Sequence, residues 1–389
     1  MKLAILQRVC PGYRVPLFSA LSKLSDPEVR LFIGSDLPNS KVKSSGNLAG
    51  VRHTKVKTRF VRLGSRLFPW HTGLIDELRA FGPDVILCEG ESHFLGYLQA
   101  IYYRARYAGR VGLIHWCFIS LPGEANHRSD LAGRVKGYFR AFFDAFLVYS
   151  SYSRQCLLEL GEEAKKIFVA TNVGNVSRFL ALSDALTETK GESRRRLGLP
   201  ERFTVLYAGT LDENKRPEVL LELAEGGDGK QYNIVLLGEG PMLEALRLRA
   251  AASQLQNVRL PGRVSDELIS YYRAADVLLI PGRGGIVISE AMACGLPVVV
   301  HEADGTESDL VVHGVTGYRL TSGTAEECNE VFQSMRAEPT LLEAMSRNGK
   351  RLVEDQFNEQ NMVRQIVRAA QFAGGEPAAE SSGHGTPDA

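Results

Sequence analysis

Short, largely apolar runs recur along this chain, with polar or glycine-containing segments between them. In the first half these runs fall at residues 3–6, 29–34, 85–88, 112–117, 143–149 and 166–175. Such runs, when turn residues bound them, are typical of strands buried in a parallel sheet. Amphipathic stretches such as 15–21 lie between them and predict helices. This alternation predicts an α/β fold with a doubly wound, Rossmann-like sheet.

The same alternation starts again after a polar segment at 183–196. The strand-like runs of the second half lie at 203–211, 233–237, 258–260, 275–280 and 298–301. We therefore expect a first Rossmann-like domain at 1–185, an exposed connector, and a second Rossmann-like domain at 198–357. A helix at 358–372 is expected to pack back on the first domain. The tail at 373–389 has too few apolar residues to pack, and we expect it to be disordered.

The most distinctive stretch follows the strand-like run that precedes residue 281. Three glycines, Gly282, Gly284 and Gly285, stand before a helix-forming segment at 287–294. Glycines ahead of a helix let backbone N–H groups approach an anion, and the helix dipole favours negative charge there. Glu290 lies in the first turns of this helix, where a carboxylate can accept hydrogen bonds from hydroxyl groups. The alternative is that the glycines only permit tight packing and Glu290 is a solvated acid, and the segment alone does not decide between these readings.

Polar residues also follow the strand-like runs of the first half. In open α/β sheets, ligands bind beyond the carboxyl ends of the strands. The residues that we expect to share that rim are Gly12, Glu89, Glu91 and His115. A lone histidine is more often packed in a core than used for chemistry, and Trp116 follows His115 directly. The position of His115 near a strand end keeps a functional role open.

Composition and charge narrow the possible functions. The chain has 389 residues, enough for two domains with cores of their own. Its formal net charge is +1 at pH 7, which argues against a globally basic nucleic-acid-binding protein. The 6 cysteines lack the paired spacing of a zinc site or a disulfide framework, and we expect buried thiols. We find no signal peptide and no window long enough to span a membrane, so a cytoplasmic protein is expected.

Basic residues are concentrated at 41–66, where acidic residues are almost absent and aromatic residues are interleaved. The cations and the histidine there are Lys41, Lys43, Arg52, His53, Lys55, Lys57, Arg59, Arg62 and Arg66. A solvated face is the more common outcome for such a segment. The alternatives are peripheral contact with anionic lipid at the inner face of the membrane, or contact with a phosphorylated acceptor.

Six short motifs follow one another in the second half. They are Ala208-Gly209-Thr210-Leu211 with Lys215; Leu237-Gly238-Glu239-Gly240-Pro241; Val258 with Gly262-Arg263-Val264; Tyr272 with Ala275-Asp276-Val277; Glu290-Ala291-Met292-Ala293-Cys294-Gly295-Leu296-Pro297-Val298-Val299; and Gly314 with Thr316-Gly317. Any one of them has little specificity, but their order and spacing together resemble family 4 glycosyltransferases. The resemblance covers the C-terminal half closely and the N-terminal half only in outline.

The resemblance implies a GT-B architecture, with two Rossmann-like domains facing a deep cleft. It implies a hexosyl- or deoxyhexosyltransferase that retains the anomeric configuration and needs neither a metal nor another cofactor. The co-substrate would be a nucleotide-diphosphate sugar, UDP- or GDP-linked, bound by the second domain. The first domain would bind the acceptor: a saccharide, a lipid-linked saccharide or a small natural product, as in polysaccharide or natural-product biosynthesis.

The resemblance also assigns roles to residues. Lys215, with Arg216, would bind the diphosphate, and Glu290 would bind the donor ribose. His115 would lie near the transferred sugar, so that His115, Lys215 and Glu290 form the expected catalytic set. The other residues expected at the donor are Gly12, Thr210, Gly238, Arg263, Gly282, Arg283, Gly284, Gly285, Ile286 and Val287.

The chain departs from the family pattern at two positions of the second half and in one loop of the first. The first glutamate of the E-x7-E motif falls at Gly282, and an arginine that often follows the first strand of the second domain is Thr210. Arg216, Arg263 or Arg283 are candidates to replace that arginine. The first-domain loop has Pro11-Gly12 in place of paired glycines.

These departures keep two alternatives open. One is a catalytically degenerate binding or scaffold protein of the same fold, motivated by Gly282. The other is a nucleotide-sugar epimerase that uses the same cleft. A dehydrogenase is disfavoured, because no G-x-G-x-x-G motif follows a first strand in either half.

Overall fold

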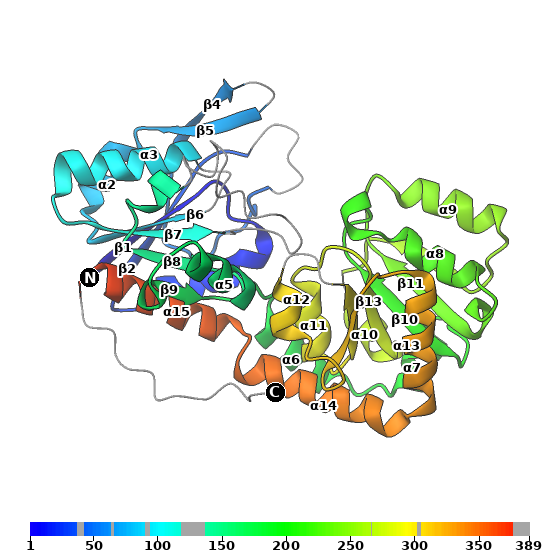
Figure 1. The fold of residues 1–389 in the computed structure, drawn as a ribbon. Coiled ribbons are helices and arrows are strands. Elements are labelled where there is room, and N and C mark those ends of the chain that lie inside the picture. Colours follow the sequence, from blue (N-terminus) through cyan, green and yellow to red (C-terminus); the bar gives the residue numbers. More distant parts are fainter. Residues whose placement is uncertain are drawn as a thin grey trace.

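Two parallel β-sheets, each flanked by helices, form the body of the molecule (Figure 1). The structure is a computed structural model, and it describes residues 1–36, 43–63, 66–89, 94–117, 137–265, 267–301 and 305–375. Lys41, Glu91 and most of the expected disordered tail lie outside the described residues. The predicted α/β class with two doubly wound sheets is confirmed.

The first sheet has seven parallel strands in the order β3-β2-β1-β6-β7-β8-β9. They are β1 (Lys2–Gln7), β2 (Glu28–Ile33), β3 (His53–Lys55), β6 (Val85–Glu89), β7 (Gly112–Cys117), β8 (Ala145–Val148) and β9 (Ile167–Val169). Helices cover both faces, so the central strands are buried on both sides, and every residue of β8 is buried. This double burial explains the nearly continuous apolar runs in the sequence.

Helices from opposite ends of the chain cover the first sheet. On one face, α1 (Val15–Ser22) packs beside α15 (Glu359–Ala373), and α15 also lies across β7, β8 and β9. On the other face, α2 (Leu74–Phe81) and α3 (Phe94–Tyr103) pack together, and α3 contacts β6. The last helix of the chain therefore belongs to the first domain.

The second sheet has six parallel strands in the order β12-β11-β10-β13-β14-β15. They are β10 (Phe203–Ala208), β11 (Tyr232–Leu237), β12 (Val258–Gly262), β13 (Val277–Ile280), β14 (Val298–His301) and β15 (Gly317–Leu320). The helices around it are α8 (Glu218–Glu225), α9 (Leu243–Ala252), α10 (Leu268–Ala274), α11 (Val287–Ala293), α12 (Thr306–Leu310), α13 (Ala325–Ala337) and α14 (Pro339–Asp355). The order reverses between β10 and β13, so the loops after these two strands lie side by side.

The chain passes to the second domain earlier than the sequence predicted. Helix α5 (Ser151–Glu159) packs on β8 and β9, but α6 (Val176–Ala185) packs on α10, α11 and α14. The expected boundary at 185 is therefore corrected to a position before α6. The reason is the apolar side of α6: Val176 and Phe179 are buried, and the Phe179 ring contacts Tyr272 of the second domain.

The polar segment at 183–196 is largely exposed, as expected, but it does not join the domains, because α6 and α7 (Lys190–Arg196) both pack on second-domain helices. Its last part forms α7, which packs on α10. Arg194 is 8% exposed, forms an ion pair with Asp276 and donates from Nε to the Ala274 carbonyl oxygen over 3.0 Å. The residues of a buried ion pair are polar in the sequence, so composition alone predicted that Arg194 would be exposed.

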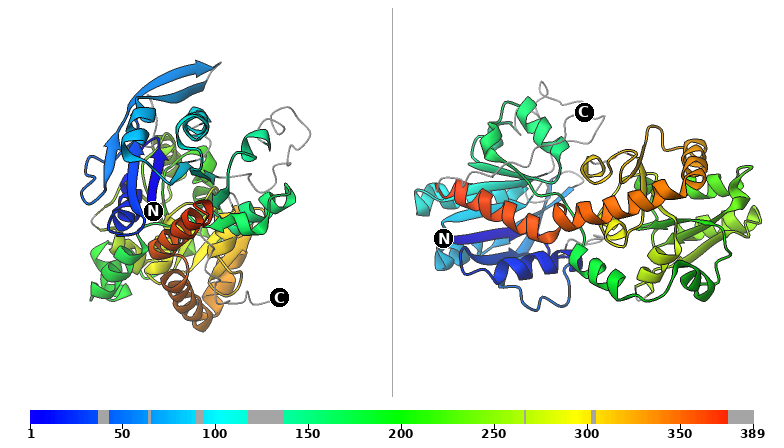
Figure 2. Two further views of the ribbon diagram at one scale, coloured as in Figure 1. Left: turned by 90° about the vertical axis from the view of Figure 1, so that its left-hand side faces the viewer. Right: turned by 90° about the horizontal axis from the view of Figure 1, so that it is seen from below.

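The return to the first domain is made by α14 and α15. Seen from below, the two helices follow one another across both halves of the molecule (Figure 2). Helix α14 contacts α11 and α12 of the second domain, whereas α15 packs on the first sheet. The two domains are thus joined twice, once before α6 and once between α14 and α15.

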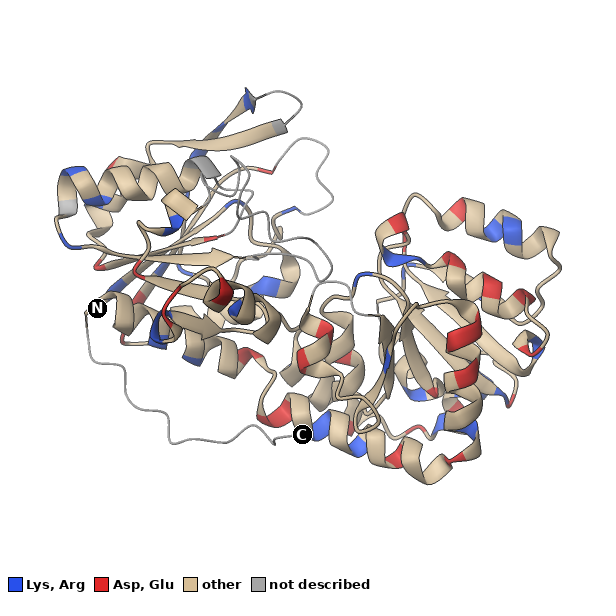
Figure 3. Cartoon of the chain, in the orientation of Figure 1, with Lys and Arg blue, Asp and Glu red and all other residues tan. Residues whose placement is uncertain are grey.

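A hairpin of β4 (Lys57–Leu63) and β5 (Arg66–Thr72) extends from the first domain (Figure 1). It carries much of the basic segment, and basic residues lie along β4 (Figure 3). Lys57, Arg59 and Val61 alternate on its exposed side. In the described part of the chain, every helix is too short or too polar to cross a bilayer. Membrane contact by this hairpin stays a prediction.

The cysteines are free thiols, and all of them except the partly exposed Cys294 are buried. Burial raises the pKa of Cys10 to about 11. The expectation of buried thiols is confirmed for all of them but Cys294.

Candidate functional site

A tight turn at residues 281–286 joins β13 to α11 at the centre of the candidate site. A Cβ at Gly282 would lie 2.5 Å from the carbonyl carbon of Lys215 and 2.6 Å from the carbonyl oxygen of Asn214. The Arg283 amide donates to that Asn214 oxygen over 2.8 Å. Backbone atoms cannot move aside as the end of a flexible side chain can, so position 282 requires glycine. The absence of a glutamate there therefore has a steric cause.

Lys215 and Glu307 form hydrogen bonds with the carbonyl oxygen and the N–H of Gly284, respectively. Lys215 ends a short 3-10 turn (Glu213–Lys215), and its ammonium donates to the Gly284 carbonyl oxygen. Glu307 lies in the first turn of α12, is fully buried, and accepts the Gly284 N–H over 2.7 Å. A cation and a carboxylate from two different segments thus fix the two peptide groups on either side of Gly284.

The next three amides, those of Gly285, Ile286 and Val287, donate no hydrogen bond to any described residue. The Lys215 Nζ would lie 3.5 Å from a Cβ at Gly285, so the ammonium stands beside the first of them. We call these four residues the Lys215 cluster. Unpaired N–H groups beside a cation suit a phosphate. The sequence also predicted a phosphate contact for the Gly284 amide, and this is corrected because Glu307 occupies that N–H.

The three arginines expected near the phosphate are placed differently from one another. Arg216 has a left-handed φ of 52°, and its Nη1 donates to the carbonyl oxygens of Pro281 and Ser322 over 3.3 and 3.2 Å. It therefore braces the turn. Arg283 and Arg263 are exposed, and their guanidinium groups make no hydrogen bond or ion pair within the described residues.

Thr210 and Gly238 follow the neighbouring strands β10 and β11. A Cβ at Gly238 would lie 1.8 Å from the Gly209 carbonyl oxygen, so the two loops pack backbone against backbone. Thr210 is exposed, and its carbonyl oxygen accepts the Tyr207 hydroxyl over 2.7 Å. Because β10 lies between β11 and β13, these loops and the glycine turn share one edge of the sheet.

Glu290 faces the first domain. Its carboxylate accepts the backbone N–H of Asn175, and a Cβ at Gly174 would lie 2.4 Å from its Oε1. Beside it, the Ser289 Oγ accepts the Gly174 N–H over 2.9 Å. Burial raises the pKa of Glu290 to about 7, although the Asn175 N–H acts in the opposite direction. No hydrogen bond joins Glu290 to Lys215 within the described part of the chain.

His115 lies two residues before the end of β7, beside Cys88 of β6, and its side chain is partly exposed. Strand β7 continues past it to Cys117, and its ring packs among aromatic side chains. Its Nε2 shares a hydrogen bond with the Tyr97 hydroxyl over 2.8 Å, and its ring stacks on Phe143 with centroids 4.8 Å apart. Burial lowers the pKa of His115 to about 3, with Arg140 acting in the same direction, so the ring is neutral at pH 7.

Gly12 and Glu89 do lie at the carboxyl ends of β1 and β6. A Cβ at Gly12 would have no atom within 4 Å, so the glycine is not required by packing here. Burial raises the pKa of Glu89, while the nearby cations Arg14 and Arg8 lower it. The structure thus places two expected rim residues at the edge of the first sheet, and Glu91 lies outside the described residues.

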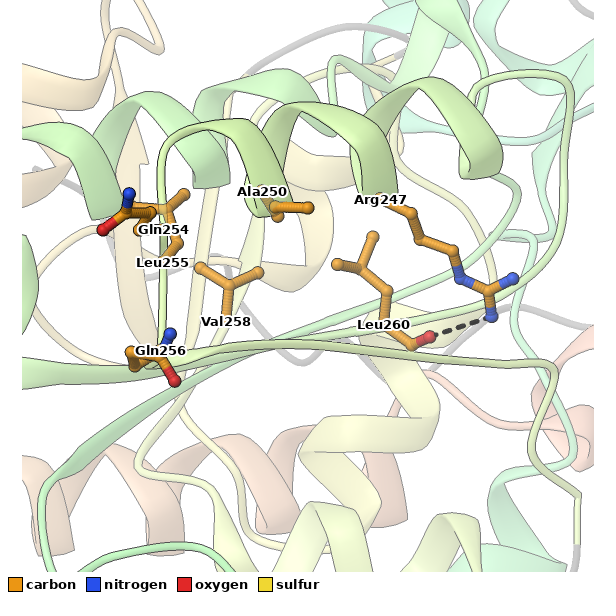
Figure 4. Close-up of a pocket in the computed structure, with 8 residues that line it drawn as sticks. Arg247, Ala250, Gln254, Leu255, Gln256, Val258 and Leu260 are labelled. Carbon is orange, nitrogen blue, oxygen red and sulfur yellow. Dashed lines mark hydrogen bonds between the residues drawn. The ribbon is translucent and has the colours of Figure 1, made fainter.

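A surface hollow of about 320 Å³ lies in the second domain, between α9 and β12 (Figure 4), and apart from the candidate residues described above. Mostly aliphatic and amide side chains line it, and Arg247 closes one end by donating to the Leu260 carbonyl oxygen over 3.1 Å. It contains none of the residues that the sequence predicted to be functional. No cluster of three or more His, Cys, Asp or Glu suited to a metal ion occurs in the described residues.

Two functional candidates were missed by sequence reasoning. Glu307 lies in an acidic loop whose position after β14 places it at the same sheet edge as the glycine turn, and this topological signal could have identified it. Arg14 lies in the loop after β1, a common ligand-binding position, but nothing in its spacing distinguishes it from a surface arginine.

Comparison with known proteins agrees with this geometry in the second domain. Residues 189–352 match the family described as "Glycosyl transferases group 1". The D-inositol 3-phosphate glycosyltransferase of Corynebacterium jeikeium (strain K411) is 36% identical over 195 residues, which cover 44% of this chain and 46% of that protein. The alpha-D-kanosaminyltransferase of Streptomyces kanamyceticus is 31% identical over 173 residues, 42% of this chain and 45% of that protein. The chain thus matches less than half the length of either relative.

Solved structures resemble the chain over nearly its whole length. Anabaena Alr3699/HepE, solved in complex with UDP, has a TM-score of 0.71 at 18% identity and covers 94% of this chain and 98% of its own. The sucrose-phosphate synthase of Thermosynechococcus elongatus has a TM-score of 0.68 at 20% identity and covers 94% and 97%. Such low identities establish the fold alone. The chain has a GT-B fold, and its residues 189–352 match the glycosyl transferases group 1 model.

Proposed function

We propose that this chain is a retaining glycosyltransferase that moves a sugar from a nucleotide-diphosphate donor to an acceptor held by the first domain. The observation that carries the proposal is the Lys215 cluster, where an ammonium and three unpaired amides meet at one loop. The match of residues 189–352 to the group 1 family, and the names of the relatives, support the same activity.

The chemistry follows from where charge develops. Transfer breaks the bond between the anomeric carbon and the β-phosphate oxygen of the donor, and negative charge grows on the leaving diphosphate. The Lys215 ammonium and the amides of Gly285, Ile286 and Val287 are fixed before the reaction. They would stabilise the leaving group more in the transition state than in the ground state. In this proposal the protein itself supplies the positive charge, and neither a metal nor another cofactor takes part.

For the donor we propose a UDP-linked hexose or deoxyhexose, with a GDP-linked sugar as the alternative. Alr3699/HepE was solved with UDP and with UDP-glucose, which supports UDP. Glu290 would accept hydrogen bonds from the ribose hydroxyls, since its carboxyl is partly exposed where the domains meet. Gly282 offers no carboxylate to the hexose, and Glu307 acts here by holding the Gly284 amide. His115 is given no role in the proposal, because its ring bonds the Tyr97 hydroxyl and stacks on Phe143.

The acceptor would be a saccharide, a lipid-linked saccharide or a small natural product, used in the cytoplasm. The exposed basic residues of the β4–β5 hairpin would suit a lipid-linked acceptor at the inner membrane face. Flotation with vesicles of anionic lipid tests this point. Protein that stays at the bottom of the gradient would contradict membrane contact and leave the transfer reaction untouched.

Calorimetric titration with UDP and GDP tests the donor site. We expect Lys215→Met to weaken UDP binding by about 30- to 100-fold, because a charge-assisted contact to phosphate is lost. Lys230→Met removes an exposed lysine of the same domain and is the matched control, expected to bind UDP as the native chain does. Absence of binding of either nucleotide to the native chain would contradict the proposal.

Mass spectrometry separates catalysis from binding. The native chain is incubated with UDP-hexoses and a mixed saccharide acceptor pool, and we expect UDP and an extended acceptor to appear together. UDP binding without sugar release would favour the non-catalytic binding protein that Gly282 suggested. Conversion of the donor without an acceptor product would favour an epimerase.

A further inference from the structure

A group of buried hydrogen-bond donors lies at the carboxyl edge of the first sheet. Arg14 follows β1 in a short 3-10 turn and is only 5% exposed. Its guanidinium lies over the ring of Trp116, 4.5 Å from the centroid, and 5.5 Å from the ring centroid of Tyr149. Together with Arg8 and Glu89 these residues form what we call the Arg14 cluster.

Most donors of this cluster have no acceptor. Arg14 Nη2 donates to the Tyr149 hydroxyl over 3.4 Å, but its Nε and Nη1 are buried without a partner. The same holds for Nη1 of Arg8 and for the indole Nε1 of Trp116. Buried N–H groups without acceptors are rare and destabilising, so four such nitrogens in one cluster indicate a place for an acceptor group.

The carboxylate of the cluster does not fill this need. Glu89 accepts the Arg8 backbone N–H and, with the Gln7 amide oriented to match, the Gln7 side chain over 3.0 and 3.2 Å. It forms no ion pair with Arg14. Among the described residues, the cluster contains two guanidinium groups and one carboxylate, and that carboxylate accepts the Arg8 backbone N–H and the Gln7 side chain. The aromatic neighbours lower the local dielectric constant and strengthen the attraction of the guanidinium groups for an anion.

The cluster lies on the side of the first domain that meets α12. Arg8, Glu89 and Tyr149 are partly exposed, so it reaches the surface. Two residues after Tyr149, the Ser151 amide donates to the Asp309 carboxylate of α12 over 2.9 Å. Helix α12 also carries Glu307, which holds the glycine turn. The Arg14 cluster and the Lys215 cluster therefore stand on either side of one contact between the domains.

We propose that the Arg14 cluster binds an anionic group, a phosphate or a carboxylate, on the acceptor sugar. The inference rests on the proposed transfer reaction and assigns the acceptor a chemical class. Planar guanidinium groups can bind two oxygens of such a group at once, and Tyr149 and Trp116 add further donors. The diphosphate of the donor is the other possible source of an anion, and the two sources are distinguishable by experiment.

Calorimetry with inorganic phosphate, glucose 6-phosphate and glucose as probes tests the inference. We expect both phosphates to bind the native chain and glucose to bind far more weakly. Arg14→Gln should weaken phosphate binding at least about tenfold and leave UDP affinity unchanged. Lys215→Met should weaken UDP binding and leave phosphate affinity unchanged. Arg52→Gln removes an exposed arginine of the same domain and should change neither affinity.

A second variant keeps the test valid if Arg14→Gln does not fold. Glu89→Gln removes the one negative charge of the cluster while keeping its shape, and we expect phosphate to bind about threefold more tightly. A purely structural role for the cluster predicts no such gain. Arg14→Lys keeps the charge without the planar fork and should fall between the native chain and Arg14→Gln.

Three outcomes would overturn the inference. Phosphate affinity that is unchanged in Arg14→Gln or not raised in Glu89→Gln would remove the cluster as an anion site. Displacement of phosphate by UDP, with loss of phosphate binding in Lys215→Met, would assign the anion to the donor. Failure of UDP to bind the native chain while phosphate still binds through Arg14 would contradict the proposed transfer reaction and leave the anion site standing.

Discussion

The carboxyl edges of the two sheets are built from different kinds of contact. At the second sheet, loops meet backbone to backbone: Gly282 lies against Lys215, and Gly238 lies against Gly209. At the first sheet, long side chains make the contacts, as where the Arg14 guanidinium lies over Trp116. The edge of the second sheet therefore depends on glycines that allow close backbone contacts. The edge of the first sheet depends on contacts between large side chains.

This difference explains how well each edge can be inferred from sequence. Where two backbone segments approach too closely for a Cβ to fit, only glycine is possible, so the sequence has a glycine at a fixed position. A side-chain contact can be made by several residue types from several positions. The second edge was accordingly predicted from its motifs, whereas Arg14 was not singled out.

The largest expected effect comes from placing a glutamate at position 282. Gly282→Glu restores the letter of the family motif, but its Cβ would overlap the backbone of residues 214 and 215. We expect the free energy of unfolding to fall by about 3 kcal/mol or more and UDP binding to be lost. Gly227→Glu is the control, because a Cβ at Gly227 has no atom within 4 Å. A stable Gly282→Glu variant with tighter UDP binding would contradict the claim that close backbone contacts require glycine at this edge.

The fold itself was largely predictable. The apolar runs gave most strands of both sheets because both faces of each sheet are covered, and buried strands need apolar residues throughout. They missed the edge strands β3 and β15, which contain exposed polar residues. The domain boundary was wrong because α6 follows the first sheet in sequence and packs on the second in space. The connector was predicted in the wrong place, because the chain crosses before α6, although most residues of 183–196 are exposed as expected. Composition could not reveal that Arg194 within it forms a buried ion pair with Asp276.

The next effect concerns Glu290, where the two domains touch. Burial raises its folded-state pKa to about 7, against an ordinary value of 4.5. The folded chain therefore binds more protons between these values, and stability falls as pH rises from about 4.5 to about 7. The loss from this one group is up to about 3 kcal/mol. Denaturant unfolding of the native chain and of Glu290→Gln at several pH values checks this.

Glu290→Gln should flatten that part of the stability profile, because an amide does not titrate. The conservative change keeps an acceptor for the Asn175 N–H. Equal pH dependence in both proteins would mean that the carboxyl titrates normally and that the contact between the domains does not depend on its protonation.

A smaller effect is expected at Glu307, which the motifs did not reveal. Glu307→Ala removes the acceptor of the buried Gly284 N–H. We expect a loss of about 1–3 kcal/mol in unfolding free energy and weaker UDP binding, because the turn beside Lys215 loses its support. Glu307→Gln keeps an acceptor oxygen and is the matched control. If Glu307→Ala binds UDP as the native chain does, the turn is held by backbone contacts alone.

The site was predictable to the extent that it depends on main-chain geometry. Lys215 and the amides of Gly285, Ile286 and Val287 were assigned from the motif and do lie together. Glu307 reaches the turn through its side chain from a loop 23 residues further along the chain, and no local spacing encodes that approach. The donor roles of Thr210, Gly238, Arg263 and Arg283 stay predictions.

The smallest effect should come from His115, whose ring packs against Tyr97 and Phe143 in the first domain. His115→Phe keeps the aromatic packing on Phe143 and leaves the Tyr97 hydroxyl without its partner, so we expect a loss of about 1 kcal/mol in unfolding free energy. Because burial lowers the pKa of His115 to about 3, the native chain also loses stability as pH falls below about 6.5, and the variant should not show this component. UDP affinity and sugar transfer should be unchanged at pH 7, measured by calorimetry and product analysis. A large fall in transfer with unchanged folding would mean that the first-domain edge contains catalytic machinery after all, and that the ring leaves its aromatic site when substrates bind.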